Sequence, residues 1–200
     1  MADLINSFNQ FVQKPNVQWA IIGFQVVLVL AIILIRLYVH NKKIRKTLAL
    51  YQSGKYEAMI APATQLKNGF AMVHSQRNKR SYNQLSLMLA SSALRIGDDE
   101  LFHKHIQDVT DEDLEYVVLM WLTVYDLNKN DMESAERHYK QFLNAKEDDK
   151  KIISQTFLDA LFTHNRNADN LMSDPFAQIG EKVNNPVMRD YLKDMINQEG

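Results

Sequence analysis

The chain of 200 residues contains 23 Lys and Arg against 24 Asp and Glu, with 46% apolar residues and no cysteine. The absence of cysteine excludes a disulfide framework, a thiol nucleophile and a cysteine-ligated zinc site. A net charge of −1 argues against a nucleic-acid-binding protein that relies on overall positive charge. The composition is that of a folded chain, and the length allows one domain or one domain with an appendage.

The first segment, 1–16, contains apolar residues spaced so that they share one face of a helix. These residues are Leu4, Ile5, Phe8, Phe11 and Val12. The spacing predicts a short segment outside the cytoplasm that lies on the membrane surface. An irregular tail with scattered apolar residues is the alternative.

A long apolar stretch follows at 17–39. Between residues 17 and 35 the chain has no charge, and its polar residues are Gln18 and Gln25. Because a helix rises about 1.5 Å per residue and a bilayer core is roughly 30 Å thick, this stretch is long enough to cross a membrane. The pattern predicts a transmembrane helix. Gln18 and Gln25 lie on one face of it, which is a candidate contact with a second copy or another membrane helix.

The flanks of this stretch fit a membrane anchor. Trp19 and Tyr38 would lie at the two interfaces, where aromatic residues are enriched, and Arg36 can extend its side chain to the headgroups. A buried core helix rarely runs so long without a charge. A cleaved signal peptide needs a basic start, a shorter apolar run and a small-residue cleavage site, none of which is present. We therefore expect an uncleaved anchor.

The near-zero net charge is the sum of two opposite regions. Residues 36–80 contain ten basic residues and one acidic residue, for a charge of +9. Residues 81–200 contain 12 basic and 22 acidic residues, for a charge of −10. The basic region directly follows the apolar stretch.

The basic residues next to the apolar stretch predict its orientation. They are Arg36, Lys42, Lys43, Arg45 and Lys46. Because cytoplasmic flanks carry the excess of Lys and Arg, we expect the N-terminus outside and the distal domain in the cytoplasm of a cell membrane. The segment 40–52 is predicted to be a basic juxtamembrane helix. It either orients the anchor alone or also holds the domain against anionic lipid.

The remaining chain, 53–200, shows helical periodicity and no strand alternation. The stretch 85–94 is apolar nearly all round and is expected to be central. Apolar stripes at helical spacing predict further helices: Leu114, Val117, Val118, Trp121, Leu122 and Tyr125; Met132, Ala135, Tyr139, Phe142 and Leu143; Ile152, Ile153, Thr156, Phe157, Ala160 and Leu161. The predicted fold class is all-α.

Capping signals support this prediction. Asn185–Pro186 and Asp174–Pro175 are typical of a helix N-cap followed by proline at the first helical position. Thr110 stands before an acidic run and is predicted to start a helix. The polar stretch 74–81, with its basic residues Arg77, Lys79 and Arg80, is predicted to be a loop.

Residues suited to a tight helix–helix corner recur along the chain. Gly54, Gly97, Asn130 and Asn165 are separated by 43, 33 and 35 residues. Gly and Asn suit such corners because they adopt the left-handed backbone conformation at low cost. This spacing predicts stacked antiparallel helical hairpins; a helical bundle with chance corner spacing is the alternative.

The best of these units, 121–143, resembles a tetratricopeptide repeat. It combines Trp121, Leu122 and Tyr125 with the corner from Asn130 to Ala135 and then Tyr139 and Leu143. Lys55-Tyr56-Glu57-Ala58 is similar to the same corner. The resemblance covers about 110 residues and implies an α-solenoid that binds protein segments. Three features depart from the pattern, namely the 43-residue first spacing, Phe102 where a small residue is usual, and Pro62, which predicts a kinked or late-starting helix.

Signals for chemistry are few. The chain has no phosphate-binding loop, no dinucleotide-binding glycine motif and no nucleophile elbow. His103 and His105 are two residues apart and would point to different sides of a helix, so no metal site is predicted. We expect no catalytic residue, no cofactor and no metal.

An acidic cluster is the candidate partner-docking face: Asp98, Asp99, Glu100, Asp108, Asp111, Glu112, Asp113 and Glu115. It would attract a basic partner, or form an ordinary solvated surface.

These observations predict a non-enzymatic scaffold or adaptor, of bacterial character, whose anchored helical domain binds an unidentified protein at the membrane. The alternative is an accessory or enzymatic subunit of a membrane complex, with a helical pocket built from acids and histidines.

Overall fold

The computed structural model describes residues 15–71, 75–146, 151–166 and 183–198, apart from the side chains of 15–23, 163–166, 196 and 198. The described residues are helical, with short connections and no strand, so the predicted all-α class is confirmed for them. The chain divides into two units, Met1–Arg45 and Lys46–Gly200. We call the second unit the helical stack. The predicted segment at 1–14 and the cap at 174–175 lie outside the described residues.

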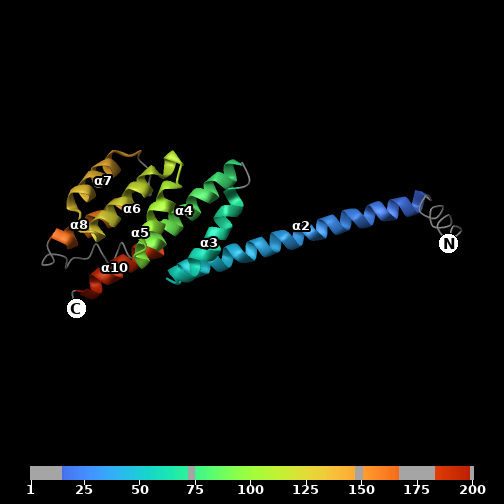
Figure 1. Cartoon of the computed structure of the whole chain (residues 1–200), viewed down its shortest axis with the longest axis horizontal. Coiled ribbons are helices and arrows are strands. Elements are labelled where there is room, and N and C mark those ends of the chain that lie inside the picture. The colour runs from blue at the N-terminus through green and yellow to red at the C-terminus, as the bar shows by residue number, and fades with distance from the viewer. Residues whose placement is uncertain (1–14, 72–74, 147–150, 167–182, 199–200) are drawn as a thin grey trace. The chain divides into compact units, whose positions relative to one another are not determined.

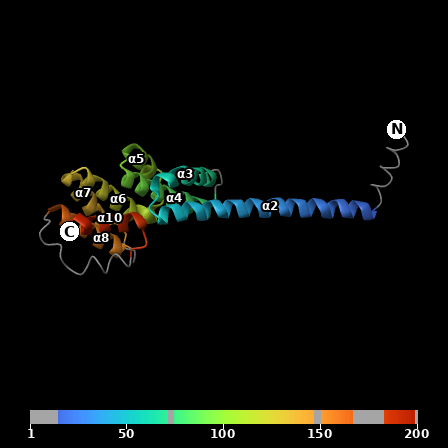
Figure 2. The same ribbon diagram turned by 90° about the horizontal axis from the view of Figure 1, so that it is seen from below.

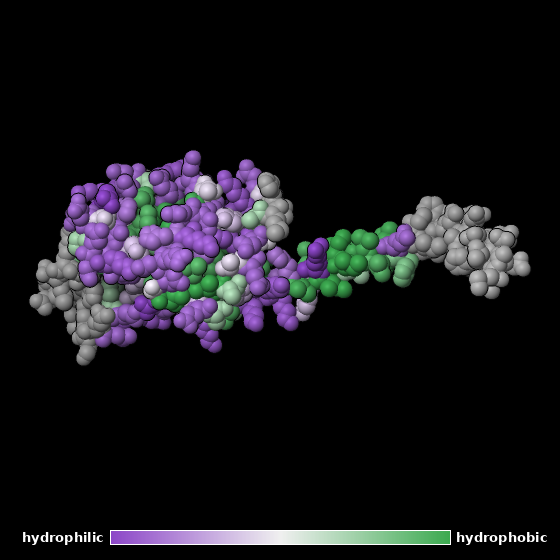
Figure 3. Space-filling model, in the orientation of Figure 1, coloured by the Kyte–Doolittle hydropathy of each residue, from purple (hydrophilic) through white to green (hydrophobic). Residues whose placement is uncertain are grey.

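Helix α2 (Pro15–Gln52) is continuous through both the predicted transmembrane stretch and the predicted juxtamembrane helix. Its large apolar side chains from Phe24 to Val39 are 46–68% exposed. The part Phe24–Gln52 contains an 18-residue window with a mean hydropathy of 1.9, none of it buried. Figure 3 shows a largely apolar stretch of this helix, coloured green, with hydrophilic patches, coloured purple, toward both of its ends. One helix near the N-terminus is therefore long and apolar enough to span a membrane.

The helical stack contains the remaining helices (Figure 1). They are α3 (Tyr56–Ala71), α4 (Gln76–Ile96), α5 (Asp99–Gln107), the 3₁₀ turn η1 (Glu112–Leu114), α6 (Glu115–Asn128), α7 (Met132–Asn144), α8 (Lys151–Arg166) and α10 (Pro186–Gln198). Helix α3 packs on α4, α4 on α5, and α6 on both α7 and α8. One apolar core runs through these layers, and its largest fully buried side chains are Trp121, Phe102, Phe142 and Phe157.

Helix α4 is central, as predicted for 85–94. It contacts α3, α5, α6 and α10, and Leu89, Ala90 and Ala93 are fully buried. The prediction of a loop at 74–81 is wrong from Gln76 onward, because α4 begins there. The Ser75 hydroxyl accepts a hydrogen bond from the Asn78 N–H and caps the first turn. A helical turn at the surface accommodates long polar side chains as readily as a loop does.

Three of the four predicted corners are confirmed. Gly54, Gly97 and Asn130 have φ values of 72°, 78° and 58°, all in the left-handed region. The fourth is wrong because α8 continues through Asn165 to Arg166. Its apolar periodicity, ending in the buried Phe162, outweighs the weak helix-breaking tendency of one asparagine.

The stripe predicted for α6 does not mark its most buried face. Its members apart from Trp121 are half-buried, whereas Leu119, Val124 and Leu127 are almost completely buried. Helix α6 packs against α4, α7 and α8, so it is covered on several sides instead of one. The stripes of α7 and α8 are confirmed in part, since Leu143 and Ile152 remain 43% and 68% exposed.

Helix ends follow the capping signals with two corrections. Asn185 caps α10 as predicted, because its Oδ1 accepts hydrogen bonds from the Val187 and Met188 N–H groups. Asp111, not Thr110, caps the η1 turn that precedes α6, because the Asp111 carboxylate accepts from the Asp113 N–H. Helix α3 starts at Tyr56 and includes Pro62, so a late start is wrong.

Candidate functional site

The predicted anchor residues are exposed wherever the structure describes them. Arg36, Tyr38, Lys42, Lys43 and Arg45 in the first unit, and Lys46 in the second, all have exposed side chains. Gln25 is exposed on α2, as a membrane contact would require. The side chains of Trp19 and Gln18 lie outside the described residues.

The structure gives several of the predicted acidic residues a partner within the fold. Asp98 accepts a hydrogen bond from the Leu101 N–H and caps α5, and Asp99 pairs with Lys129 at 2.5 Å. Asp108 pairs with Lys67, a contact that no local signal predicted. Exposed carboxylates without such a local role remain at Glu100, Glu112 and Glu115. Capping and pairing within the fold account for much of what the sequence presents as a cluster.

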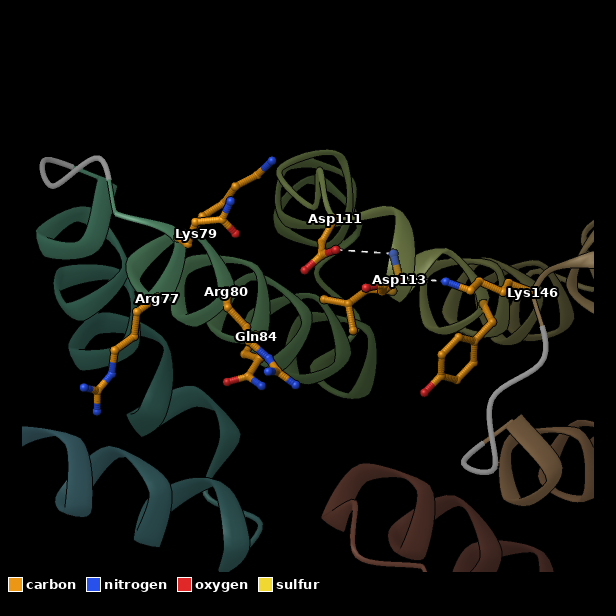
Figure 4. Close-up of a pocket in the computed structure, with 10 residues that line it drawn as sticks. Arg77, Lys79, Arg80, Gln84, Asp111, Asp113 and Lys146 are labelled. Atoms are coloured by element: carbon orange, nitrogen blue, oxygen red, sulfur yellow. Dashed lines mark hydrogen bonds and ion pairs between the residues drawn. The ribbon is translucent and has the colours of Figure 1, made fainter.

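A polar groove lies at the N-terminal end of α4 (Figure 4). It has a volume of about 800 Å³. Three segments line it: the first turns of α4, the η1 turn with the start of α6, and the chain after α7. Its lining residues are Gln76, Arg77, Lys79, Arg80, Gln84, Asp111, Asp113, Leu114, Tyr116 and Lys146.

The groove carries both signs of charge. Figure 4 shows Lys146 directed at Asp113, where its Nζ lies 3.1 Å from the carboxylate, while Arg77 points away from the two aspartates. Arg80 and Gln84 are one helical turn apart on α4, so they share a face. The sequence identified Arg77, Lys79 and Arg80 as basic residues, but it did not place Asp111, Asp113 and Lys146 opposite them. Such a lining suits a polar segment that carries both charged donors and acceptors.

A second polar group lies buried between α3 and α5. Lys67 is 4% exposed and His105 is 1% exposed. The Lys67 ammonium contacts the Asp108 carboxylate and lies 2.8 Å from His105 Nδ1. Because an ammonium group can only donate, Nδ1 accepts, and the neutral ring carries its proton on Nε2. That Nε2 is buried without a hydrogen-bond partner.

The pKa values of this group follow from its burial and charges. Burial, and then the nearby Lys67 charge, lower the pKa of His105 below its usual value. Burial alone would raise the pKa of Asp108, but the contact with the Lys67 cation outweighs it and lowers that pKa. Burial and the Asp108 charge raise the pKa of Tyr82, whose ring lies 5.0 Å from Lys67 Nζ. At neutral pH the arrangement is a Lys–Asp ion pair beside a neutral histidine.

The described residues contain no group of three or more His, Cys, Asp or Glu side chains placed to hold a metal ion. His103 is exposed and contacts the Tyr125 ring at 4.7 Å, whereas His105 is buried against Lys67. The two histidines therefore lie in different environments, as their spacing predicted. Phe102 stacks on Tyr125 at 4.8 Å and fills the space between α5 and α6 with a large ring.

Comparison with protein-family models, with curated proteins and with solved structures finds no match to this chain.

Proposed function

We propose that this chain is a membrane-anchored adaptor, in which α2 crosses the bilayer and the helical stack binds another protein at the cytoplasmic face. The observation that carries the proposal is the exposure of α2. Its large apolar side chains from Phe24 to Val39 are exposed, and none of the apolar window is buried. Apolar surface left in water costs about 25 cal/mol per Å², so a bilayer is the environment that accommodates this helix.

The basic residues from Arg36 to Lys46 support an orientation with the stack in the cytoplasm. Each of them near an anionic leaflet adds about 1 kcal/mol of attraction. The side chains of these basic residues are exposed. Tethering at a surface raises the local concentration of whatever the stack binds, so modest affinity is sufficient for recruitment.

The stack has features of a tetratricopeptide-like array. Left-handed corners at Gly54, Gly97 and Asn130 join successive helices. Ala135, at the small-residue position of the second helix of its unit, is completely buried, and Trp121 of the first helix is 1% exposed. Helical hairpins stacked in this way form extended surfaces on which such proteins bind segments of others.

The groove at the start of α4 is the part of the stack that we assign to partner binding. It is open, lined by four cations and two carboxylates, and large enough for several residues of an extended segment. Charges on its rim would set the register and speed of association more than the affinity. The partner segment is therefore expected to contain both acidic and basic residues.

Photo-crosslinking in membranes tests this proposal. A photoreactive residue is placed at Arg80 or at Lys146 in the groove, and at Glu57, which is exposed on α3, as the matched control. We expect a crosslinked protein from the two groove positions and not from the control, and we expect Asp113→Lys to remove it. If no protein crosslinks and a small molecule raises the melting temperature instead, the adaptor function is wrong.

A further inference from the structure

The buried residues Lys67, His105 and Asp108 connect helices that are far apart in the chain. Helices α3 and α5 both pack on α4 (Figures 1 and 2). Lys67 extends from α3 and His105 from α5, and Asp108 directly follows α5. Tyr82 of α4 lies beside them, because its ring is 5.0 Å from the Lys67 ammonium. We call these four residues the buried polar group.

His105 is not the residue that would make this junction most stable. Its side chain is 1% exposed, and its Nε2 is a buried donor without a hydrogen-bond partner. A donor in that state loses its hydration without compensation. A buried polar group that costs stability requires another explanation, and histidine is the side chain whose ordinary pKa lies closest to neutral pH.

Protonation of His105 is incompatible with the contact that it makes. Because Nε2 already carries the proton of the neutral ring, a second proton goes to Nδ1. Nδ1 then becomes a donor, and it faces the Lys67 ammonium 2.8 Å away, which is also only a donor. The contact between the two cannot persist in that state. Two cations would share the Asp108 carboxylate, and the buried polar group would change from neutral to positively charged.

The titratable groups around His105 come from each element packed against α5. They are Lys67 on α3, Tyr82 on α4, Tyr125 on α6, Lys104 on α5 itself and Asp108 after it. Burial and then the Lys67 charge lower the pKa of His105, and Asp108 acts in the opposite direction. The side chain of Asp108 is 31% exposed against 5% for Lys67, so water reaches the group from the Asp108 side.

Asp108 lies three residues before the acidic side of the groove at the start of α4. That side consists of Asp111 and Asp113, which Figure 4 shows on the opposite side of the groove from Arg80. We call Asp111 and Asp113 the acidic rim. Asp111 caps the η1 turn that contains Asp113, so the position of the turn depends on the chain that leads into it.

Two contacts hold the chain just before the acidic rim. Lys67 pairs with Asp108, and the Oδ1 of the completely buried Asn83 accepts a hydrogen bond from the Thr110 N–H at 3.2 Å. The contact of the rim with Lys146 is weaker, because the two side chains of that pair are 83% and 79% exposed. Loss of the hold on Asp108 therefore leaves the start of the rim attached through Thr110.

We propose that the buried polar group positions the acidic rim, and that protonation of His105 releases the rim, so that the groove binds its partner at neutral pH and loses it in acid. Lys67 and His105 are positioning residues, because they act on the groove without lining it. The effect on binding rests on the proposed function, whereas the movement of the rim does not.

Distances between spin labels on the full chain in detergent micelles test the movement. One pair is Gln65→Cys on α3 with Glu112→Cys on the η1 turn, and the control pair is Gln65→Cys with Gln141→Cys on α7; all three positions are exposed. The pH is lowered from 7.5 to about 4.5, a range in which Asp108 stays charged because its pKa lies below 3.8.

We expect the first pair to change from one narrow distance distribution to a longer and broader one, with a midpoint below pH 6.5, because the pKa of His105 is lowered from that value. The control pair should not change. An unchanged first pair would overturn the proposal. A change in both pairs would overturn it as well, because it would mean that the whole stack unfolds.

His105→Gln identifies the group that gains the proton. The glutamine amide oxygen can accept from Lys67 at every pH, so the first pair should keep its narrow distribution over the whole range. His103→Gln, at an exposed position of the same helix, is the matched control and should respond like the unchanged chain. A His105→Gln chain that still responds to acid would contradict the proposal. If this variant does not fold, the response of the unchanged chain remains decisive.

Photo-crosslinking from Arg80 in isolated membranes tests the consequence for binding. We expect the yield of crosslinked protein to fall about 5-fold or more between pH 7.5 and about 4.5, and the His105→Gln chain to keep its yield. Equal yields at the two pH values would overturn the regulation and leave the adaptor function standing. No crosslinked protein at either pH would overturn the adaptor function, whereas the spin-label distances would still decide whether the buried polar group holds the rim.

Discussion

The apolar side chains of α2 and those of the helical stack are of the same kinds but have opposite exposures. Ile35 and Leu34 on α2 are 63% and 65% exposed, whereas Leu89 and Val124 in the stack are completely buried. The stack interrupts its apolar residues with polar ones at helical spacing, so each helix has a side that faces water. Residues 24–39 of α2 have no such polar side. A lipid bilayer would cover this apolar surface, so no other part of the chain has to cover it.

This comparison separates two sources of stability. The stack is held by apolar burial among its own helices, and by local caps and a buried ion pair. For α2, the stabilisation that comes from burying apolar side chains must be supplied by the surroundings of the chain. Changes to α2 should therefore alter where the chain resides, and changes to the stack should alter whether it folds.

The largest expected effect is on membrane partitioning. Leu30→Arg together with Ile33→Arg places two guanidinium groups near the middle of the predicted span, each at a cost of about 2.5–3.5 kcal/mol. We expect the chain to move from the carbonate-resistant membrane fraction to the soluble or aggregated fraction. Leu143→Arg, at a position 43% exposed in the stack, is the control and should leave the chain in the membrane. A doubly substituted chain that resists extraction like the unchanged one would show that α2 is not the anchor.

The next largest effect is on folding of the stack. Phe102→Ala removes a completely buried ring that stacks on Tyr125, and it should lower the free energy of unfolding by about 3–5 kcal/mol. Urea denaturation in micelles, followed by tryptophan fluorescence, measures this loss. Membrane retention of the variant should be unchanged, and its loss would contradict the separation between the two regions.

A smaller effect is expected at the buried ion pair. Lys67→Met leaves Asp108 without its cation and should cost about 1.5–3 kcal/mol of unfolding free energy at pH 7. Lys55→Met, at an exposed position, is the matched control and should be nearly neutral. Equal stabilities of the two variants would show that the Lys67 contact contributes nothing.

The same variant should change how stability depends on pH. The pKa of His105 lies below the usual 6.5, so its contribution is complete above about 6.5 and is lost as the pH falls through the lower folded value. The pKa of Asp108 lies below 3.8, so its contribution is lost at still lower pH. Lys67 lowers both values, and Lys67→Met should therefore flatten the acid side of the stability profile. An unchanged slope between pH 7 and pH 4 would refute this explanation.

The smallest effect distinguishes two glycines. Gly97 has a φ of 78° and open space around it, so Gly97→Ala meets no clash but strains the backbone by about 1–2 kcal/mol. Gly69 lies inside α3 with nothing within 4 Å of an added Cβ, so Gly69→Ala should raise stability by about 0.5–1 kcal/mol. Thermal melts of the two variants should shift in opposite directions. Shifts of the same sign would contradict the assignment of Gly97 as a left-handed corner.

Local sequence patterns were sufficient to predict the helices and many of the caps and corners at their ends. Gly54, Gly97 and Asn130 act through their own backbone conformation, and Asn185 through atoms two and three residues away, so each leaves a signal in sequence. The buried polar group joins Lys67 to His105 and Asp108, which lie 38 and 41 positions later in the chain. Nothing local distinguishes Lys67 from the exposed cations near it. The most buried side of α6 was also not predicted from local patterns, because it is set by packing against three other helices.

The candidate site shows the same limit. Sequence placed Arg77, Lys79 and Arg80 close together but in a loop, and placed Asp111 and Asp113 in an acidic face. The groove arises because packing of α4 beside the η1 turn brings these groups together with Lys146. A charge pattern along the chain does not reveal which charges will meet across it.

Single-cysteine labelling in intact cells tests the anchored adaptor most directly, because the chain has no cysteine of its own. Ser7→Cys precedes the predicted span, and Glu133→Cys lies at an exposed position on α7. With a membrane-impermeant maleimide, Ser7→Cys should be labelled in intact cells and Glu133→Cys only after permeabilisation. Labelling of Glu133→Cys in intact cells would contradict a cytoplasmic stack, and equal protection of both positions would contradict a span at α2.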